Sequence, residues 1–464
     1  MTVTDITAHS DSAGRRRSQL VLVICSTGLL MVGLDATIVN IALPAIHRSL
    51  HSSLAGLQWT VDAYTLVLAS LLMLAGSTAD RVGRRRVFQL GLLVFSLGSL
   101  LCAVAPTQNV LIAARVVQAV GGSMLSPVAM SIIRNVFVDP VERARAIGVY
   151  AAMFGLSIAL GPVLGGTLVQ AVGWRAVFLV NVPVGALAIL ATHRFVPESR
   201  AERPRRVDPV GQLLVILGLA SLTYGIIEGP TRGWASIGIV ASLATAVLAF
   251  VALVLYELRR REPLLEVRFF RSAPFSGASA IAVCAFAALG AFLFLNTLYL
   301  QNARGLSPLR AGMCLLPMAG MVLLFAPISG HLVGSRGPRP ALLASGVALM
   351  ASVALLTQVE ASTSIGYVLV AYALFGVGFG LVNPPITNTA VSGMPASQAG
   401  VAAAVASTSR QVGLTIGVAM AGAIAGDRAW WIILAVVTGV LVLGAVSTTR
   451  WAEATARRTA EAHA

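Results

Sequence analysis

Three charged side chains lie inside long apolar runs of the sequence: Asp35, Asp62 and Arg115. An ionisable group in membrane hydrocarbon costs about 2.5–3.5 kcal/mol on insertion scales, unless it is paired or faces a water-filled cavity. Counting along each run at about 1.5 Å per residue places the three groups at similar depths. They can therefore form ion pairs, or pass protons, if their segments are neighbours.

Two uses of these carboxyl groups remain open. Burial favours the protonated form of a carboxyl group and a nearby Arg favours the ionised form, so Asp35 or Asp62 can exchange a proton when its surroundings change. Alternatively, either Asp caps a helix or pairs with Arg115 only to hold helices together. Both interpretations require long membrane helices that position the charges.

The composition predicts such helices. The 464 residues are 57% hydrophobic and only 11% charged, and the mean hydropathy is +0.85. Continuous apolar runs of about twenty residues are typical of membrane helices, whereas barrel strands alternate over about ten residues. We expect an all-α polytopic membrane protein with fourteen spans. They lie near 19–46, 55–79, 87–105, 108–132, 145–170, 175–195, 209–227, 235–257, 275–300, 311–333, 340–358, 364–384, 402–425 and 430–448.

The basic residues indicate the orientation of these spans. All 33 are Arg, and most lie in alternate connections. The opposite connections hold only Arg48, Arg175, Arg232, Arg304, Arg310 and Arg428. Positive residues favour the cytoplasmic side, so both termini are predicted to be cytoplasmic. This distribution also explains the net charge of +15 without a nucleic-acid partner.

Two long polar connections, 196–208 and 258–274, divide the predicted spans into six, two and six. We expect a cytoplasmic tail at 1–18, a six-helix half at 19–195 and cytoplasmic linkers with two extra helices at 196–274. A second six-helix half at 275–448 and a cytoplasmic tail at 449–464 complete the predicted organisation. Two six-helix halves are typical of transporters built from repeats.

A segment rich in Gly and Arg, GSTADRVGRRR at 76–86, follows the second span. Gly76 and Gly83 are predicted to permit a tight turn. Asp80 is placed to accept hydrogen bonds from Arg side chains or a helix N-terminus. Arg81 and Arg84 belong to the same basic cluster, which can also serve only as a positive anchor on the cytoplasmic side.

A second segment, GLSIALGPVLGG at 155–166, lies within the fifth span. It contains Gly155, Gly161, Pro162, Gly165 and Gly166. Small residues let helices approach closely, and Pro inside a span bends it. Simple helix packing and a bend built for function are both open interpretations, and the density of Gly and Pro favours the bend.

Sequence motifs of several other classes are absent. Without Lys there is no Walker A loop, and neither GxSxG nor HExxH occurs, so we expect no enzyme activity. His47 and His51 have helical spacing but no third ligand nearby, so we predict no metal site. Arg15 to Arg17 followed by apolar residues is similar to a secretory signal. The apolar stretch is too long for one, and we interpret it as the first span.

The chain resembles the fourteen-helix drug:proton antiporters of the major facilitator superfamily over nearly its whole length. The matching segments are LDATIVNIALPAI at 34–46, QWTVDAY at 58–64, GSTADRVGRRR at 76–86, the fourth span with Arg115, Gln118 and Gly121, GLSIALGPVLGG at 155–166 and WRAVFLVNVPVG at 174–185. Ala119 departs from the family's pattern, which has Gly after the Gln of the fourth span. Spans 311–333 and 402–425 lack the additional acids of some multidrug members.

The resemblance implies a major facilitator fold and roles for particular residues. Asp35 and Asp62 would act in proton coupling or cation recognition, and Arg115 with Gln118 in coupling. Asp80 and Arg84 would act in gating, and Gly161 and Pro162 in the bend of the fifth span. The missing acids fit a monocationic, neutral or single-class substrate.

The predicted function is proton-coupled efflux of a small hydrophobic or cationic drug or antibiotic. Alternatives are a narrow exporter of a natural product made by the host and, less favoured, a nutrient:proton symporter. The expected partners are a small-molecule substrate, protons and the lipid bilayer. We expect a monomer in the plasma membrane that uses the proton gradient and no cofactor.

Overall fold

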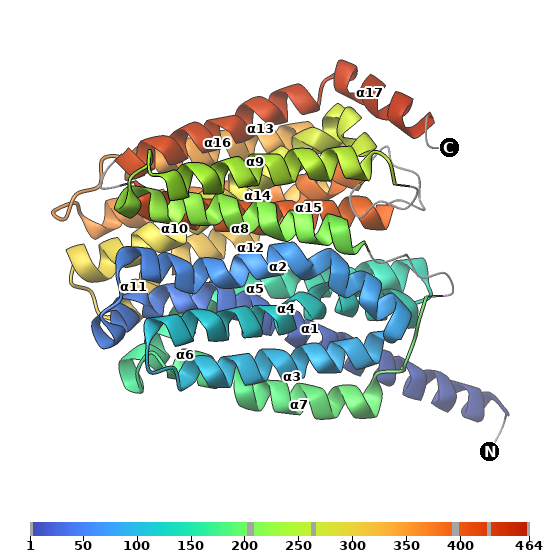
Figure 1. Ribbon diagram of the computed structural model, residues 1–464. Helices are drawn as coiled ribbons and strands as arrows, with labels where there is room; N and C mark the ends of the chain where they lie inside the picture. Colours follow the sequence, from blue (N-terminus) through green and yellow to red (C-terminus); the bar gives the residue numbers. More distant parts are fainter. Residues whose placement is uncertain (1–2, 202–207, 261–265, 392–398, 425–427, 462–464) are drawn as a thin grey trace.

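The computed structural model describes residues 3–201, 208–260, 266–391, 399–424 and 428–461. It shows a bundle of helices that run along a common direction, with the N- and C-termini at the same end (Figure 1). Parts of the predicted linkers, including Arg203, Arg205, Arg206 and Arg261, lie outside the described residues, as do the extreme ends of both predicted tails.

The first group of helices lies on one side of the bundle (Figure 1). Its members are α1 (Val3–Leu50), α2 (Leu54–Val82), α3 (Arg84–Ala103), α4 (Gln108–Val136), α5 (Pro140–Ala171), α6 (Ala176–Leu179) and α7 (Asn181–Phe195). In an apolar medium the backbone must satisfy its own hydrogen bonds, which is why these apolar runs are helical. Ser53, Thr107 and Asp139 cap α2, α4 and α5 by accepting bonds from backbone N–H groups.

The second group lies on the other side and consists of α10 (Ala273–Leu298), the π-helix η2 (Tyr299–Ala303), α11 (Pro308–Cys314), α12 (Leu316–Arg336), α13 (Pro338–Leu356), α14 (Ile365–Val391), α15 (Ala399–Ala423) and α16 (Arg428–Ser447). Helix α2 packs against α15, and α5 packs against α11 and α12. These contacts join the two groups.

Two helices follow the first group in the chain, and one of them lies against the seam where α2 meets α15. They are α8 (Pro209–Arg232) and α9 (Ile237–Glu257), and α8 packs against both α2 and α15. Gln212 of α8 donates a hydrogen bond to the carbonyl of Ser70 at 2.5 Å, and the indole of Trp59 donates to Glu228 at 3.1 Å. Helix α8 therefore braces the junction of the two groups, and α9 packs against α8.

Within the described residues, thirteen helices are long and apolar enough to cross a membrane. The chain is thus a multi-pass membrane protein. Helix α15 occupies the range of the thirteenth predicted span, 402–425, and is not among these thirteen. The total of fourteen spans and the boundaries of the predicted halves remain predictions.

Several helices extend beyond their apolar runs, which corrects the expected turn at 76–86. Helix α2 continues to Val82, and Ser77 and Thr78 within it donate hydrogen bonds to the carbonyl of Leu74. Gly76 therefore lies inside a helix and takes no part in the turn. The turn is made at Gly83 alone, whose φ of 127° strongly favours glycine.

Other helices also depart from the predicted spans and tails. The single span predicted at 175–195 is divided into α6 and α7 at Val180. The span predicted at 311–333 is likewise divided between α11 and α12, which begins at Leu316. Two segments predicted as polar tails contain helix: α1 begins at Val3, and α17 (Arg450–Glu461) follows α16. The short 3-10 helix η1 (Val267–Arg271) lies in a predicted linker.

Candidate functional site

A buried ion pair joins α1 to α4 at the centre of the first group. Arg115 donates a hydrogen bond to the carboxylate of Asp35, and the side chains are 1% and 0% exposed. The Arg115 Nε donates to the carbonyl of Thr60 at 3.0 Å, and its guanidinium lies 4.1 Å from the centre of the Tyr64 ring. The pairing of Asp35 with Arg115 is confirmed, whereas their roles in coupling remain predictions.

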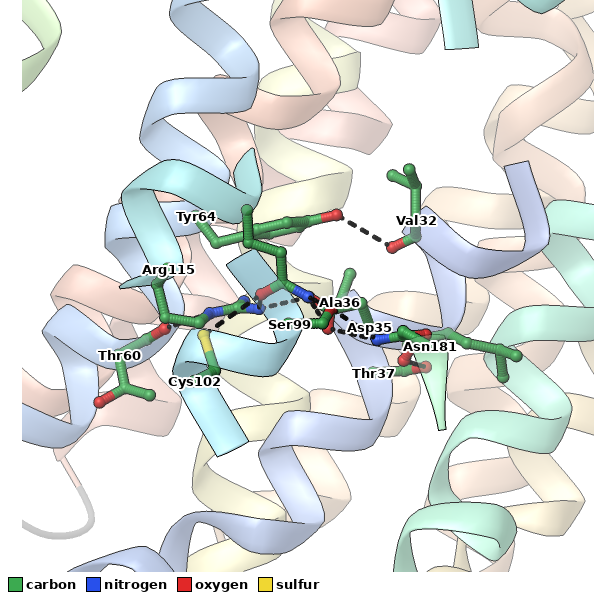
Figure 2. Close-up of polar contacts among 12 residues, drawn as sticks. Val32, Asp35, Ala36, Thr37, Thr60, Tyr64, Ser99, Cys102, Arg115 and Asn181 are labelled. Carbon is green, nitrogen blue, oxygen red and sulfur yellow. Dashed lines mark hydrogen bonds and ion pairs between the residues drawn. The ribbon is translucent and has the colours of Figure 1, made fainter. Parts of the chain in front are cut away.

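The second oxygen of Asp35 accepts hydrogen bonds from two amide side chains. Gln118 donates to it at 2.7 Å and Asn181 at 3.3 Å, and both amides also donate to the hydroxyl of Ser99. Figure 2 shows Asp35, Arg115, Asn181 and Ser99 converging from separate helices. Loss or gain of a proton on Asp35 would therefore change the bonding of every member of this network.

Sequence reasoning singled out Gln118 but missed Ser99 and Asn181. Both are polar residues inside apolar runs, and Asn181 lies in the segment WRAVFLVNVPVG. A polar side chain in a span is the available signal, although it does not identify the partner.

Asp62 belongs to a different contact, between α2 and α15. On the same face of α2, Gln58 donates hydrogen bonds to the carbonyls of Val418 and Ala419, and Thr65 contacts Thr415 at 2.8 Å. Asp62 lies between Gln58 and Thr65 at helical spacing, so it faces the seam between the groups. Its Oδ1 has a long contact of 3.5 Å with the Thr65 hydroxyl.

The other oxygen of Asp62, Oδ2, is buried and has no hydrogen-bond partner among the described residues. No cation of the described chain lies within ion-pair distance of it. The interpretation in which Asp62 pairs with Arg115 is therefore wrong for this conformation, because Arg115 is paired with Asp35.

The glycines of the fifth span bring α5 into close contact with α1. A Cβ at Gly161 would lie 1.9 Å from the hydroxyl oxygen of Thr37, and one at Gly165 would lie 2.8 Å from Ile38. These approaches are shorter than van der Waals contact, so only glycine fits without a shift. The helix is unbroken through Pro162, and the bend remains a prediction.

The same segment also contacts the second group. A Cβ at Gly166 would lie 2.5 Å from the carbonyl oxygen of Pro308, and one at Gly312 would lie 2.2 Å from that of Pro162. Gly155 is placed differently, since it lines a cavity close to Leu323. Pro162 and Gly166 therefore lie on the seam between α5 and α11, at the end of the bundle opposite Gly83.

The turn at Gly83 is held by acidic side chains. Asp80 accepts hydrogen bonds from Arg84 at 2.9 and 3.0 Å, as the sequence predicts. Glu198, which sequence reasoning missed, accepts from the backbone N–H of Arg85 at 3.1 Å, and the backbone N–H of Arg84 donates to Ser199. Arg81 lies in the last turn of α2, and the gating role expected of Asp80 and Arg84 remains a prediction.

A cavity of about 1290 Å³ lies between the two groups of helices. Its walls are mostly apolar and come from α1, α2, α4 and α5 on one side and α10, α12, α14 and α15 on the other. Asp80, Arg134 and Asp208 line it at the Gly83 end. At the opposite end Gln58 bonds α15, and the side chain of Gln301 donates to the carbonyl of Ile41 at 2.9 Å. The cavity is therefore open at one end and closed at the other.

Neither Asp35 nor Asp62 is among the described residues that line this cavity. Asp35 is separated from it by its neighbours on α1, because Ala36 and Thr37 face the cavity while Asp35 faces α4 and α7. Direct recognition of a cation by either carboxylate therefore has no geometric support in this conformation.

The family model of the Major Facilitator Superfamily matches residues 25–418. The chain belongs to this superfamily. It is therefore a transporter and not an enzyme, and the resemblance found in the sequence motifs is confirmed at this level. A crystal structure of a peptide transporter in complex with sulfate has the same fold, with a TM-score of 0.69 and 14% identity over 96% of this chain and 95% of that one.

Relatives within the superfamily carry names that refer to resistance. The chain is 40% identical to the multidrug resistance protein Stp of Mycobacterium tuberculosis over 88% of this chain and 76% of that protein. It is 37% identical to the tetracenomycin C resistance and export protein of Streptomyces glaucescens, over 96% and 81% of the two chains. It is 36% identical to the methylenomycin A resistance protein of Streptomyces coelicolor, over 92% and 90%.

Proposed function

We propose that the chain is a proton-coupled exporter of a small, largely apolar drug or antibiotic, and that it belongs to the fourteen-helix drug:proton antiporters. The observation that carries the proposal is the cavity of about 1290 Å³ between the two groups, whose lining reaches the exposed Arg134 at the Gly83 end. A substrate of several hundred daltons fits such a space. The resistance and export names of the relatives support efflux as the direction of transport.

In this proposal two six-helix halves rock about the cavity, and the two central helices brace them. The Gly83 end faces the cytoplasm, as the distribution of Arg favours, so the structure represents the state that loads substrate from inside. The seam of α5 with α11 closes the outer end. Opening this seam while the Gly83 end closes would release the substrate outside.

Proton coupling is assigned to the two carboxyl groups. Protonation of Asp35 would weaken its ion pair with Arg115 and disturb the hydrogen bonds of Gln118 and Asn181, so α1, α4 and α7 would rearrange. Asp62 lies on the α2–α15 seam, and its unpartnered oxygen is a place where a proton can be held. Each group connects protonation to a helix contact that must change during transport.

A growth-inhibition panel in a bacterial host without its own pumps tests the export function. Cells expressing the wild type or Asp35→Asn would be exposed to dyes, cationic antiseptics and antibiotics, among them tetracenomycin C, methylenomycin A and puromycin. We expect protection against at least one compound, and we expect Asp35→Asn to abolish it. Well-expressed wild type that protects against none of them would contradict export of antibiotics.

The symporter alternative is distinguished with everted vesicles whose interior is acidified. An antiporter accumulates its substrate in them as protons leave, whereas a symporter exports substrate together with protons. Accumulation that a protonophore abolishes is the expected result. A narrow exporter of a natural product would also accumulate its substrate in these vesicles, but only for one class of compound.

A further inference from the structure

The interior of the cavity carries one charged side chain among the described residues, Arg410 of α15. It lies eleven residues after the start of α15, a depth of about 16 Å from that end of the helix. The other charged lining residues, Asp80, Arg134, Asp208 and Glu266, lie at helix ends or next to them, at the mouth. A ligand in the interior therefore meets a cation.

The guanidinium of Arg410 has spare hydrogen-bonding capacity. One terminal nitrogen donates to the hydroxyl of Thr387 at 2.5 Å, and the buried Nε has no acceptor among the described residues. No carboxylate of the described chain lies within ion-pair distance. The sequences of α10 to α16 contain no Asp or Glu at all, so the second group cannot neutralise this charge from its helices.

Three carboxylates in or behind the cavity wall are paired with other arginines. Asp35 is paired with Arg115 behind the wall formed by α1. At the mouth, Asp80 is paired with Arg84 and Asp208 lies 3.5 Å from Arg260. An uncompensated cation in a membrane span is costly, and an anionic partner reduces that cost.

Aromatic rings lie next to this cation. The guanidinium is 5.8 Å from the centre of the Phe286 ring, and Phe286 lies 6.3 Å from Phe154. Both rings line the cavity, and the side chains of Ser407 and Gln411 line it one helical turn or less from Arg410. The local surface thus offers a positive charge, polar groups and flat apolar faces.

We propose that the cavity binds small organic anions, with a carboxylate or phenolate of the substrate on Arg410 and an aromatic body against Phe286 and Phe154. This inference rests on the proposed export function and specifies its substrate class. It replaces the expectation of a cationic substrate, which required Asp35 or Asp62 to reach the cavity.

Two xanthene dyes of similar size provide the test, because fluorescein is anionic at pH 8 and rhodamine 123 is cationic. Their dissociation constants would be measured by fluorescence polarisation on the purified full-length protein in detergent. A charge-assisted hydrogen bond predicts that wild type binds fluorescein about tenfold or more tightly than rhodamine 123. Arg410→Gln should lose that preference, and Arg410→Lys should retain most of it.

Arg134→Gln is the matched control, since it removes an exposed positive charge at the mouth of the same cavity. Its affinity for fluorescein should change by less than about threefold, as expected for a solvated charge. Gel filtration and thermal unfolding would verify that each variant is folded. The proposal would be overturned if wild type bound the two dyes equally, preferred rhodamine 123, or bound neither dye while folded. It would also be overturned if Arg410→Gln kept the preference of wild type for fluorescein.

The two proposals fail in different ways. Proton-driven export of cationic compounds that does not depend on Arg410 would leave the export function standing and refute the anion site. Binding of fluorescein through Arg410 without any proton-driven transport would confirm the anion site and refute the export function.

Discussion

Replacing Gly161 by Ala tests whether the glycines of α5 set its close packing against α1. The added Cβ would lie 1.9 Å from the Thr37 hydroxyl oxygen and 2.8 Å from the Thr37 Cβ. Rotation of Thr37 would relieve only the first clash, and it would cost the hydrogen bonds of this hydroxyl to the carbonyls of Gly33 and Ser157. Helices α1 and α5 must therefore move apart.

Overpacking of this kind costs about 1–3 kcal/mol, to which the loss of hydrogen bonds adds about 1 kcal/mol. We expect Gly161→Ala to lower the free energy of unfolding by about 2–4 kcal/mol. Adding Thr37→Ala should recover only part of this loss, because the contact between the two Cβ atoms remains.

Gly148→Ala is the matched control on the same helix, because no atom lies within 4 Å of a Cβ at that position. Ala has a higher helix propensity than Gly, so this variant should be neutral or more stable by up to about 1 kcal/mol. Denaturant titration of both purified variants in mixed micelles gives the comparison. Equal stability of Gly161→Ala and Gly148→Ala would refute the packing argument.

Three further variants test other contacts. Arg115→Gln leaves the Asp35 carboxylate buried without its cation and should lower the free energy of unfolding by about 3–5 kcal/mol in the same titration. Asp35→Asn in the Arg115→Gln background should restore stability. Additive losses of stability in the double variant would contradict the ion pair. Gly83→Ala adds a clash with Glu198 to the strain of a positive φ, whereas Gly233→Ala adds strain in open space. Gly83→Ala should therefore be the less stable of the two, and equal losses would show that the Glu198 contact is unimportant. Gly312→Ala places a Cβ 2.2 Å from the Pro162 carbonyl oxygen and should reduce the transport rate. Gly320→Ala places its Cβ in open space and should not reduce it. Equal transport rates of the two variants would exclude a role for the α5–α11 seam.

The positions of the spans could be predicted from the sequence because apolar runs of membrane length have few alternatives to helix. Their ends could not, because a helix continues into polar sequence until a residue such as Gly83 stops it. The break at Val180 leaves little trace in hydropathy, because the residues around it are apolar except for Asn181.

The candidate site was predictable in part. The cost of burying a charge marks Asp35, Asp62 and Arg115 in the sequence, but which Asp pairs with Arg115 depends on how α1, α2 and α4 pack. The same limit hid Asn181 and Ser99, which reach Asp35 from other helices. Arg410 lies in the predicted span 402–425 but was not singled out from the sequence, because its place in the cavity depends on the packing of α15 between α10 and α2.

Coupling of substrate movement to protons through Asp35 can be measured in reconstituted proteoliposomes. Uptake of the best compound from the growth panel would be followed with and without an acidic interior, for wild type and Asp35→Asn. We expect wild type to accumulate the compound only with the proton gradient, and we expect Asp35→Asn to exchange it across the membrane without accumulation. Equal uptake by wild type with and without the gradient, or gradient-driven accumulation by Asp35→Asn, would contradict it.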